Sequence, residues 1–427
     1  MADKQDIQER YEGTKRMDGG FSSNGLEAIG PALQGVVDAG DLSGFVTLVW
    51  RKGEVVRVDT VGHRDIEGGK PMTRDTLFRI ASMTKPITSV AALMLMEEGR
   101  LKLDDPITRW APEFSDMQVL AAPTGPLDDT VPAARDITIE DLMTHRAGLA
   151  YGFTSMGPIA EAHEKALGPA LGTPLAPDEW MKRLGELPLS FQPGDRFHYS
   201  HATDVLGFII GRIEGKPFDQ VLQDRVFGPL GMSDTAFHVP PDKLDRAAKL
   251  YRINPKTDAM EEVPFPYYQA PPAFAAGGGG LVSTADDYLK FARLMLGKGE
   301  VDGVRLLKAE TVEMMTADRL TAAQREIPFM GIPFWMGQGF GLGVSMITDP
   351  VKQAWMGAGN AGAFGWPGAF GTWWQADPEA EMVLIYLIQN SMPLGPEAAA
   401  QLATGQRMGG RAALPVFQKM VYGALAG

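Results

Sequence analysis

The chain of 427 residues contains no cysteine. This absence excludes disulfide bonds, thiolate nucleophiles and cysteine-ligated metals in one step. Histidine is sparse, with six residues, and none of them falls in an H-E-x-x-H pattern or a comparable metal-binding spacing. The sequence therefore predicts a site without a metal, and nothing in it calls for another cofactor.

Clusters of basic residues and long apolar runs are also missing. The formal net charge is -13, which argues against nucleic acid and anionic membrane surfaces as partners. The apolar run at 382–388 is too short to cross a bilayer and is typical of a buried strand. The charged segment Met1–Arg10 has no apolar stretch like that of a secretory signal. We therefore expect a cytoplasmic protein, and the sequence leaves its oligomeric state open.

Several common enzyme motifs are absent as well. No G-x-S-x-G elbow occurs, which excludes an α/β-hydrolase. The glycines at 277–280 lack the Lys-Ser/Thr that follows a phosphate-binding loop, so a hinge or the entry to a sheet is the better interpretation. The glycine-rich stretch 337–343 imitates a dinucleotide loop but has no strand before it and no helix after it, which favours a glycine-rich strand.

The hydrophobic pattern predicts strands at both ends of the chain and helices between them. We expect strands over 45–51, 54–62, 366–376 and 381–389, and helices after Ser82, from about 137, over 205–213, from the Ser283–Asp287 cap to Leu296, and over 411–425. This order indicates an α+β fold in which both ends share one antiparallel sheet. Residues 1–105 and 265–427 would form an α/β sandwich, residues 106–264 a mainly helical domain, and the active site would lie in the cleft between them.

The tetrapeptide that carries most chemical information is Ser82-Met83-Thr84-Lys85, at the start of an apolar helix. A serine hydroxyl is a poor nucleophile and needs a base beside it. A helix places residues three apart on one face, so Lys85 can lie next to Ser82. The pattern predicts that Ser82 is a nucleophile, although a helix start with a solvated lysine would look the same in isolation.

Two further segments offer candidate residues. Tyr199 stands in a turn-rich stretch directly before the predicted helix 205–213, where a domain-seam tyrosine is the alternative. In the segment 365–369, Gly368 permits a close backbone approach and the Ala369 N–H can donate to an oxyanion, whereas a bulged strand is the alternative. Phe364 and Trp366 alternate along the predicted strand, share one face, and could line an acyl pocket.

Taken together, these motifs resemble a known superfamily. Ser82-x-x-Lys85, Tyr199-x-His201 and Trp366-Pro367-Gly368 follow one another in the order typical of serine β-lactamases and penicillin-binding proteins. Within that superfamily, the chain is similar to the class C β-lactamase-like carboxylesterases, the family VIII esterases, over residues 25–425. The resemblance implies a β-lactamase-like fold and an acylated Ser82. It implies acid–base roles for Lys85 and Tyr199, and an oxyanion hole of the Ser82 and Ala369 N–H groups.

The chain departs from the β-lactamase pattern at two positions. Trp366 and Pro367 replace a basic residue and its hydroxyl neighbour, so a substrate carboxylate loses a contact worth roughly 1.5–3 kcal/mol. His201 replaces an asparagine and would either donate to a substrate carbonyl or orient Tyr199. We therefore expect a carboxylesterase that acts on small, neutral, short-chain esters. A β-lactamase, a D-Ala peptidase, an acyltransferase and a sensor acylated only once are the alternatives.

Overall fold

The computed structural model describes residues 16–391 and 413–425, and its main feature is one eight-stranded sheet. Neighbouring strands are antiparallel, in the order β14-β15-β16-β17-β18-β3-β4-β5. The strands are β3 (Gly44–Arg51), β4 (Glu54–Asp65), β5 (Lys70–Pro71), β14 (Gln338–Phe340), β15 (Ser345–Ile347), β16 (Phe364–Gly365), β17 (Trp373–Asp377) and β18 (Met382–Ile388). Because β18 pairs with β3, the two ends of the chain share one sheet, as the sequence predicts.

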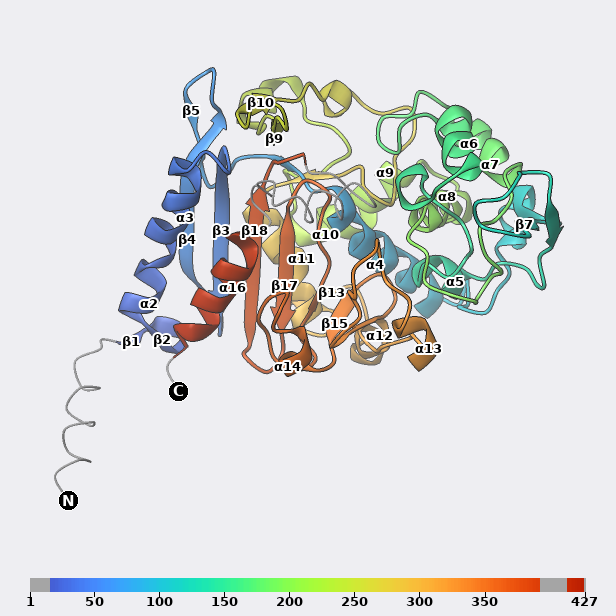
Figure 1. Cartoon of the computed structure of the whole chain (residues 1–427). Coiled ribbons are helices and arrows are strands. Elements are labelled where there is room, and N and C mark those ends of the chain that lie inside the picture. The colour runs from blue at the N-terminus through green and yellow to red at the C-terminus, as the bar shows by residue number, and fades with distance from the viewer. Residues whose placement is uncertain (1–15, 392–412, 426–427) are drawn as a thin grey trace.

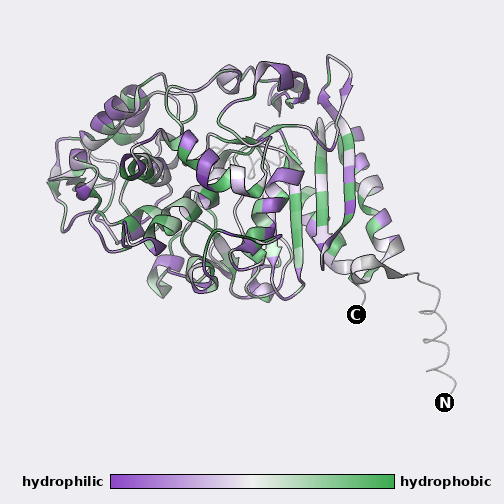
Figure 2. Cartoon of the chain, turned by 180° about the vertical axis from the view of Figure 1, so that it is seen from behind, coloured by the Kyte–Doolittle hydropathy of each residue, from purple (hydrophilic) through white to green (hydrophobic). Residues whose placement is uncertain are grey.

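Helices cover both faces of this sheet (Figure 1). Alternate residues of β18 point to opposite faces, as the period of two requires. Leu384 and Tyr386 pack toward α3 (Ile29–Asp38) and α16 (Ala413–Gly423), whereas Val383 and Ile385 pack toward α11 (Ala285–Leu296). The inner strands are accordingly apolar along most of their length (Figure 2).

Most of the predicted elements are present near their expected bounds. The hairpin of β3 and β4 is confirmed, and so is the C-terminal helix, of which residues 411 and 412 lie outside the described part. The helix expected to end at Leu296 begins at Ala285, where Thr284 accepts a hydrogen bond from the Asp287 N–H at 3.2 Å. The charged segment Met1–Arg10 also lies outside the described residues.

The predicted strand over 366–376 is wrong in its first half. Phe364 pairs with Ala376, so the chain leaves β16, turns through residues 366–372 and returns as β17. Pro367 has no N–H to donate to a sheet ladder, and Gly371 has a φ of +86°, which favours glycine. The resulting loop, rather than a straight strand, presents the Gly368-Ala369 backbone.

The middle of the chain is mainly helical. The helix α4 (Thr84–Glu97) is buried on nearly all sides because it packs against α8 (Ala202–Glu214) within the hydrophobic core that also covers one face of the sheet. The helix expected from about 137 is α5 (Ile139–Met143), and a capping box between Thr138 and Asp141 begins it. Within the described residues, no helix is long and apolar enough to cross a membrane.

Shorter elements complete the fold. The remaining helices are α2 (Ser23–Glu27), α6 (Pro158–Leu167), α7 (Pro177–Gly185), α9 (Phe218–Leu222), α10 (Gly228–Leu230), α12 (Ala309–Met315), α13 (Ala322–Arg325) and α14 (Pro350–Gln353). The remaining strands are β1 (Arg16–Met17), β2 (Phe21–Ser22), β6 (Phe78–Arg79), β7 (Gln118–Leu120), β8 (Thr130–Pro132), β9 (Tyr251–Ile253), β10 (Met260–Glu262), β11 (Val282–Ser283), β12 (Glu300–Val301) and β13 (Val304–Arg305).

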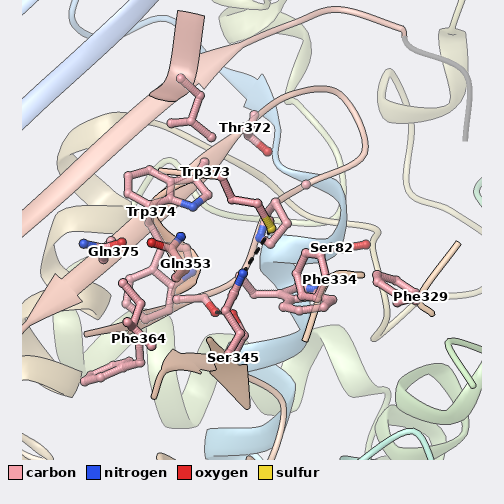
Figure 3. Close-up of a pocket in the computed structure, with 18 of the residues that line it drawn as sticks. Ser82, Phe329, Phe334, Ser345, Gln353, Phe364, Thr372, Trp373, Trp374 and Gln375 are labelled. Atoms are coloured by element: carbon pink, nitrogen blue, oxygen red, sulfur yellow. Dashed lines mark hydrogen bonds between the residues drawn. The ribbon is translucent and has the colours of Figure 1, made fainter. Parts of the chain in front are cut away.

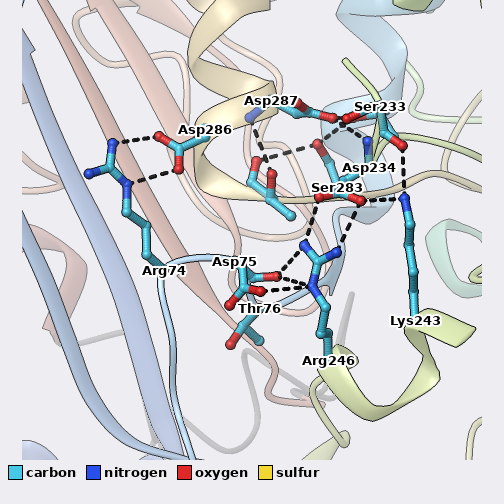
Figure 4. Close-up of polar contacts among 12 residues, drawn as sticks. Arg74, Asp75, Thr76, Ser233, Asp234, Lys243, Arg246, Ser283, Asp286 and Asp287 are labelled. Carbon is cyan, nitrogen blue, oxygen red and sulfur yellow. Dashed lines mark hydrogen bonds and ion pairs between the residues drawn. The ribbon is translucent and has the colours of Figure 1, made fainter. Parts of the chain in front are cut away.

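A polar cluster fastens the segment that leads to Ser82 (Figure 4). The Arg246 guanidinium donates to the Asp234 carboxylate at 2.7 Å and to the Asp75 carbonyl at 2.7 Å. Lys243 adds a second ion pair to Asp234, at 2.7 Å. The Asp234 N–H in turn donates to the Asp287 carboxylate on α11 at 2.7 Å. These contacts hold the chain before β6 against the 234–246 segment, and they hold that segment against α11.

Candidate active site

Ser82 lies on a single 3-10 turn, Ala81–Met83, directly before α4. The sequence predicts it at the start of a helix, and the structure places it in the turn that leads directly into α4. Ser82 is partly exposed, whereas its neighbours Ala81 and Met83 are buried. Ala81 has a φ of +45°, a conformation that costs about 1–3 kcal/mol for residues other than glycine. The turn therefore presents the Ser82 hydroxyl outward from a tightly packed segment.

Lys85 lies directly beside Ser82. The Lys85 Nζ lies 3.3 Å from the Ser82 Oγ, and the Lys85 residue is 1% exposed. The same Nζ donates to the Gly278 carbonyl at 2.5 Å and lies 3.4 Å from the Tyr151 hydroxyl. Three partners thus fix the amine beside the hydroxyl, as the spacing of three residues predicts.

Tyr151, Asp204 and Gly278 form a buried network that the sequence reasoning missed. The Tyr151 hydroxyl donates to Asp204 at 3.2 Å, and the Gly278 N–H donates to the same carboxylate at 2.7 Å. A Cβ on Gly278 would lie 2.7 Å from the Tyr151 oxygen and 2.8 Å from Asp204. The run of four glycines was the available signal, because it indicates a close backbone approach.

Tyr151 remains a phenol in this setting. Burial raises the pKa of Tyr151 well above its ordinary value, and the negative charge of Asp204 acts in the same direction. The hydroxyl can therefore donate to Asp204 and accept from Lys85, but it cannot serve as a phenolate base. Its geometric role is to hold the Lys85 amine in place.

The aromatic ring of Tyr199 lies beside the Lys85 amine. The Lys85 Nζ lies 4.4 Å from the centroid of the Tyr199 ring, and the Tyr199 hydroxyl accepts a hydrogen bond from Trp366 Nε1 at 3.1 Å. The ring of His145 lies 4.5 Å from that of Tyr199. Burial lowers the pKa of His145 well below its ordinary value, so this ring is neutral. The structure thus brings together Ser82, Lys85 and Tyr199.

His201 does not lie where a substrate-binding side chain is expected. It is 4% exposed and is absent from the lining of the cavity at Ser82. Its Nδ1 lies 2.8 Å from the Asp204 carboxylate on the first turn of α8, and its ring packs against Tyr151 at 4.2 Å. The pairing with Asp204 turns the ring away from the cavity, so His201 supports the network behind Lys85, and it packs on Tyr151 rather than on Tyr199.

The loop 366–372 lies directly against the backbone before Ser82. Thr372 Oγ1 donates to the Ile80 carbonyl at 3.1 Å, and the Gly368 N–H donates to the Thr372 carbonyl at 2.7 Å. A Cβ on Gly368 would lie 2.3 Å from the Ile80 oxygen. The Ala369 N–H has no acceptor among the described residues, and Ala369 lines the same cavity as Ser82. This N–H is therefore free to donate to a developing oxyanion.

A cavity of about 610 Å³ opens at Ser82 and follows the outer strands of the sheet. Figure 3 shows Ser82 with Phe329 and Phe334 on one side and Gln353 and Gln375 on the other. Of the residues predicted to bind substrate, Phe364, Trp366 and Gly368 line it and His201 does not. The predicted oxyanion donor Ala369 lines it as well. Its lining in the described chain contains no Lys, Arg, Asp, Glu or His. Among all residues that the structure describes, no group of three His, Asp or Glu residues could hold a metal ion.

The fold and this site together define a class of protein. A partly exposed serine beside a buried lysine, at a helix start against an antiparallel sheet, is the arrangement of a serine hydrolase with a β-lactamase-like fold. The chain belongs to the beta-lactamase family, whose model matches residues 31–406. The predicted α+β fold is therefore confirmed.

Individual relatives agree with this assignment. The chain is 51% identical to Protein Rv1367c of Mycobacterium tuberculosis over 92% of its own length and 98% of that protein. It is 34% identical to Esterase EstB of Burkholderia gladioli, over 79% of this chain and 83% of that one. Among solved structures, EstCE1, described as a hydrolase with promiscuous acyltransferase activity, matches with a TM-score of 0.76 and 26% identity, over 94% of this chain and 98% of that one.

Proposed function

We propose that the protein is a carboxylesterase that hydrolyses small, neutral, short-chain esters through an acyl-Ser82 intermediate. The observation that carries the proposal is the 3.3 Å contact between Lys85 Nζ and Ser82 Oγ at the mouth of a cavity without charged side chains. The similarity to Esterase EstB supports the same reaction class.

The proposed reaction has two steps. In the first, Lys85 takes the hydroxyl proton while Ser82 Oγ bonds to the ester carbonyl carbon, and the N–H groups of Ser82 and Ala369 stabilise the oxyanion. The carbon–oxygen bond to the alcohol then breaks, and the alcohol leaves with a proton supplied through the Lys85–Tyr199 pair. In the second step water attacks the acyl-Ser82 ester, releases the acid and restores the serine hydroxyl.

The preference for neutral esters rests on Trp366. Its indole N–H donates to the Tyr199 hydroxyl at 3.1 Å, so this position binds a catalytic side chain instead of a substrate carboxylate. A buried carboxylate without a cationic partner would be strongly disfavoured in this cavity. We therefore propose that β-lactams, which carry such a carboxylate, are poor substrates.

Acyl transfer to an alcohol is the second candidate function. It is favoured by EstCE1, which combines hydrolase and acyltransferase activities by its description. Both reactions share the acyl-Ser82 step and differ in whether water or an alcohol attacks it. Adding a primary alcohol to the assay distinguishes them, because a transferase forms the new ester in preference to the free acid.

The test combines turnover with labelling. We expect steady-state hydrolysis of p-nitrophenyl butanoate and attachment of a fluorophosphonate probe at one residue, Ser82. Ser82→Ala should abolish both, whereas Ser115→Ala, an exposed serine in the helical section, should change neither. Labelling of Ser82→Ala at the wild-type rate would refute the nucleophile, and a single burst without turnover would favour a sensor.

A further inference from the structure

Arg79 lies three residues before Ser82, at the end of β6, and is a buried arginine that the proposed reaction does not use. We propose that Arg79 is a positioning residue for the oxyanion hole: its guanidinium holds Phe370 in place, and with it the adjacent Ala369 N–H. The proposal rests on the proposed esterase function, because it concerns the same oxyanion. Arg79 is absent from the lining of the cavity, so it acts through the loop 366–372 and not on the substrate.

Aromatic rings surround the Arg79 guanidinium. Its central carbon lies 4.5 Å from the ring centroid of Tyr268 and 5.5 Å from that of Phe265. The ring centroid of Phe370, in the loop 366–372, lies 6.0 Å from the same carbon. Phe265 and Phe370 also meet edge to face, with their centroids 5.4 Å apart. Because a cation within about 6 Å of a ring centroid is attracted to the ring, the guanidinium holds the loop against the segment around Phe265.

Hydrogen bonds fix the orientation of the same arginine. Its Nη2 donates to the Ala248 carbonyl at 2.6 Å, and its Nη1 donates to the Phe265 carbonyl at 3.5 Å. Its backbone N–H donates to the Gln389 Oε1 at 2.8 Å. The residue after Gln389, Asn390, donates its own N–H to the Phe370 carbonyl at 3.0 Å. The backbone and the side chain of the arginine are thus both tied to segments that contact Phe370.

The burial of this charge calls for a reason. Arg79 is 6% exposed, and burial lowers its pKa to about 10, so the guanidinium stays charged at pH 7. Its side-chain hydrogen bonds in the described chain go to carbonyl oxygens, and no carboxylate of that part forms an ion pair with it. A buried ionic group can often be replaced by apolar side chains without loss of stability. A planar cation at this place therefore indicates a role beyond filling space.

The position of one oxyanion donor depends on this support. Ala369 directly precedes Phe370 and lines the cavity beside Ser82. If Phe370 loses its support, the Ala369 N–H shifts with it, and a displacement of about 1 Å can lower a rate by about 10²-fold. The oxyanion forms only in the transition state, so the loss of Arg79 should lower kcat and leave KM nearly unchanged.

The experiment uses two variants of Arg79. Arg79→Met removes the charge and the donors, whereas Arg79→Lys keeps the charge but not the planar group that contacts the rings. We expect both to lower kcat for p-nitrophenyl butanoate about 10–100-fold, with KM within about threefold of wild type. If Arg79→Met does not fold, Arg79→Lys carries the test. Wild-type kcat in a folded Arg79→Lys enzyme would refute the role.

Arg51→Lys is the matched control. The Arg51 guanidinium also lies over a phenyl ring, that of Phe21 at 5.3 Å, and it also donates to a carbonyl, that of Ala380 at 2.9 Å. It stands at the end of β3, in the hairpin with β4, and not at the loop 366–372. Arg51→Lys should lower Tm and leave kcat unchanged, which distinguishes lost positioning from lost stability.

A double-mutant cycle tests whether Arg79 acts through Phe370. Phe370→Leu removes the ring that the guanidinium contacts and should lower kcat by a similar factor. In the combined variant with Arg79→Lys, the loss should not exceed that of the stronger single variant, because both changes break the same link. Losses that multiply would show two independent effects and would refute action through Phe370.

The rate at which a fluorophosphonate labels Ser82 separates this proposal from the esterase function. The P=O oxygen of the probe occupies the oxyanion hole during attack, so the labelling rate of Arg79→Lys should fall by about the same factor as kcat. If wild type hydrolyses no ester, the esterase function fails and the labelling rates alone decide the role of Arg79. If wild type hydrolyses esters and both rates of Arg79→Lys stay within about threefold of wild type, the positioning role is refuted while the esterase function stands.

Discussion

Gly368 offers the most direct test of the proposed oxyanion hole, because no side chain has room at this position. A Cβ there would lie 2.1 Å from Thr372 Oγ1 and 2.3 Å from the Ile80 carbonyl oxygen. The Thr372 hydroxyl can rotate, but the Ile80 oxygen belongs to the backbone just before the Ser82 turn. In Gly368→Ala the loop 366–372 must therefore move away from Ile80, at a typical cost of about 1–3 kcal/mol for overpacking.

This movement should affect catalysis more than binding. It carries the Ala369 N–H away from the oxyanion, and loss of one such donor lowers kcat by roughly 10²–10³-fold. Because the oxyanion forms only in the transition state, KM for p-nitrophenyl butanoate should change little. The assay measures kcat, KM and Tm on the same preparations, so that a loss of folded protein is not mistaken for a loss of rate.

The matched control for this variant is Gly69→Ala. Gly69 lies in the hairpin between β4 and β5 and has a positive φ, +62°, but a Cβ there would meet nothing within 4 Å. We expect a modest fall in Tm, from about 1–2 kcal/mol of backbone strain, and unchanged kcat. A folded Gly368→Ala enzyme with kcat within about threefold of wild type would refute the reasoning.

Three further predictions concern acid–base chemistry, selectivity and stability. Tyr199→Phe should lower kcat about 10²–10⁴-fold, measured by steady-state hydrolysis of p-nitrophenyl butanoate. Trp366→Lys should lower kcat/KM for that ester and raise it about tenfold for a cephalosporin, whose carboxylate gains a cation. Arg246→Ala should lower Tm at pH 7, and the difference from wild type should shrink at pH 3. The hydrogen bonds from Arg246 lower the pKa of Asp234, so the stabilisation they provide is lost as pH falls and the carboxyl is protonated.

Each of these has a result that contradicts it. Near-wild-type kcat in a folded Tyr199→Phe enzyme would remove Tyr199 from the mechanism. A wild-type enzyme that prefers the cephalosporin over the ester would promote the β-lactamase alternative. A Tm difference for Arg246→Ala that stays constant from pH 7 to pH 3 would show that the Asp234 ion pair does not carry the effect.

Local sequence patterns were sufficient to predict most of the helices and strands and to place Lys85 beside Ser82. The spacing of three residues places Lys85 beside Ser82 on any helical turn, and the structure has them 3.3 Å apart. The alternation of apolar residues predicts the paired strands β3 and β18, and the capping residue Thr284 marks the start of α11. These features depend on neighbours within a few positions, which a sequence shows directly.

The sequence also shows the Trp366-Pro367-Gly368 motif, but it does not show that this motif lies in a loop. Pro367 and Gly371 favour a turn, yet the strong apolar pattern around them suggested one continuous strand. The pairing of Phe364 with Ala376 decides the matter, and the loop it creates places Ala369 at the cavity. Strand register is a contact between separate segments, so local pattern alone could not determine it.

What only the tertiary structure decided is the surroundings of Lys85. Tyr151, Asp204 and Gly278 come from three separate segments and meet only because α4, α8 and the tetraglycine pack together. The same packing turns His201 toward Asp204. Such contacts arise from long-range packing, and no spacing along the chain encodes them.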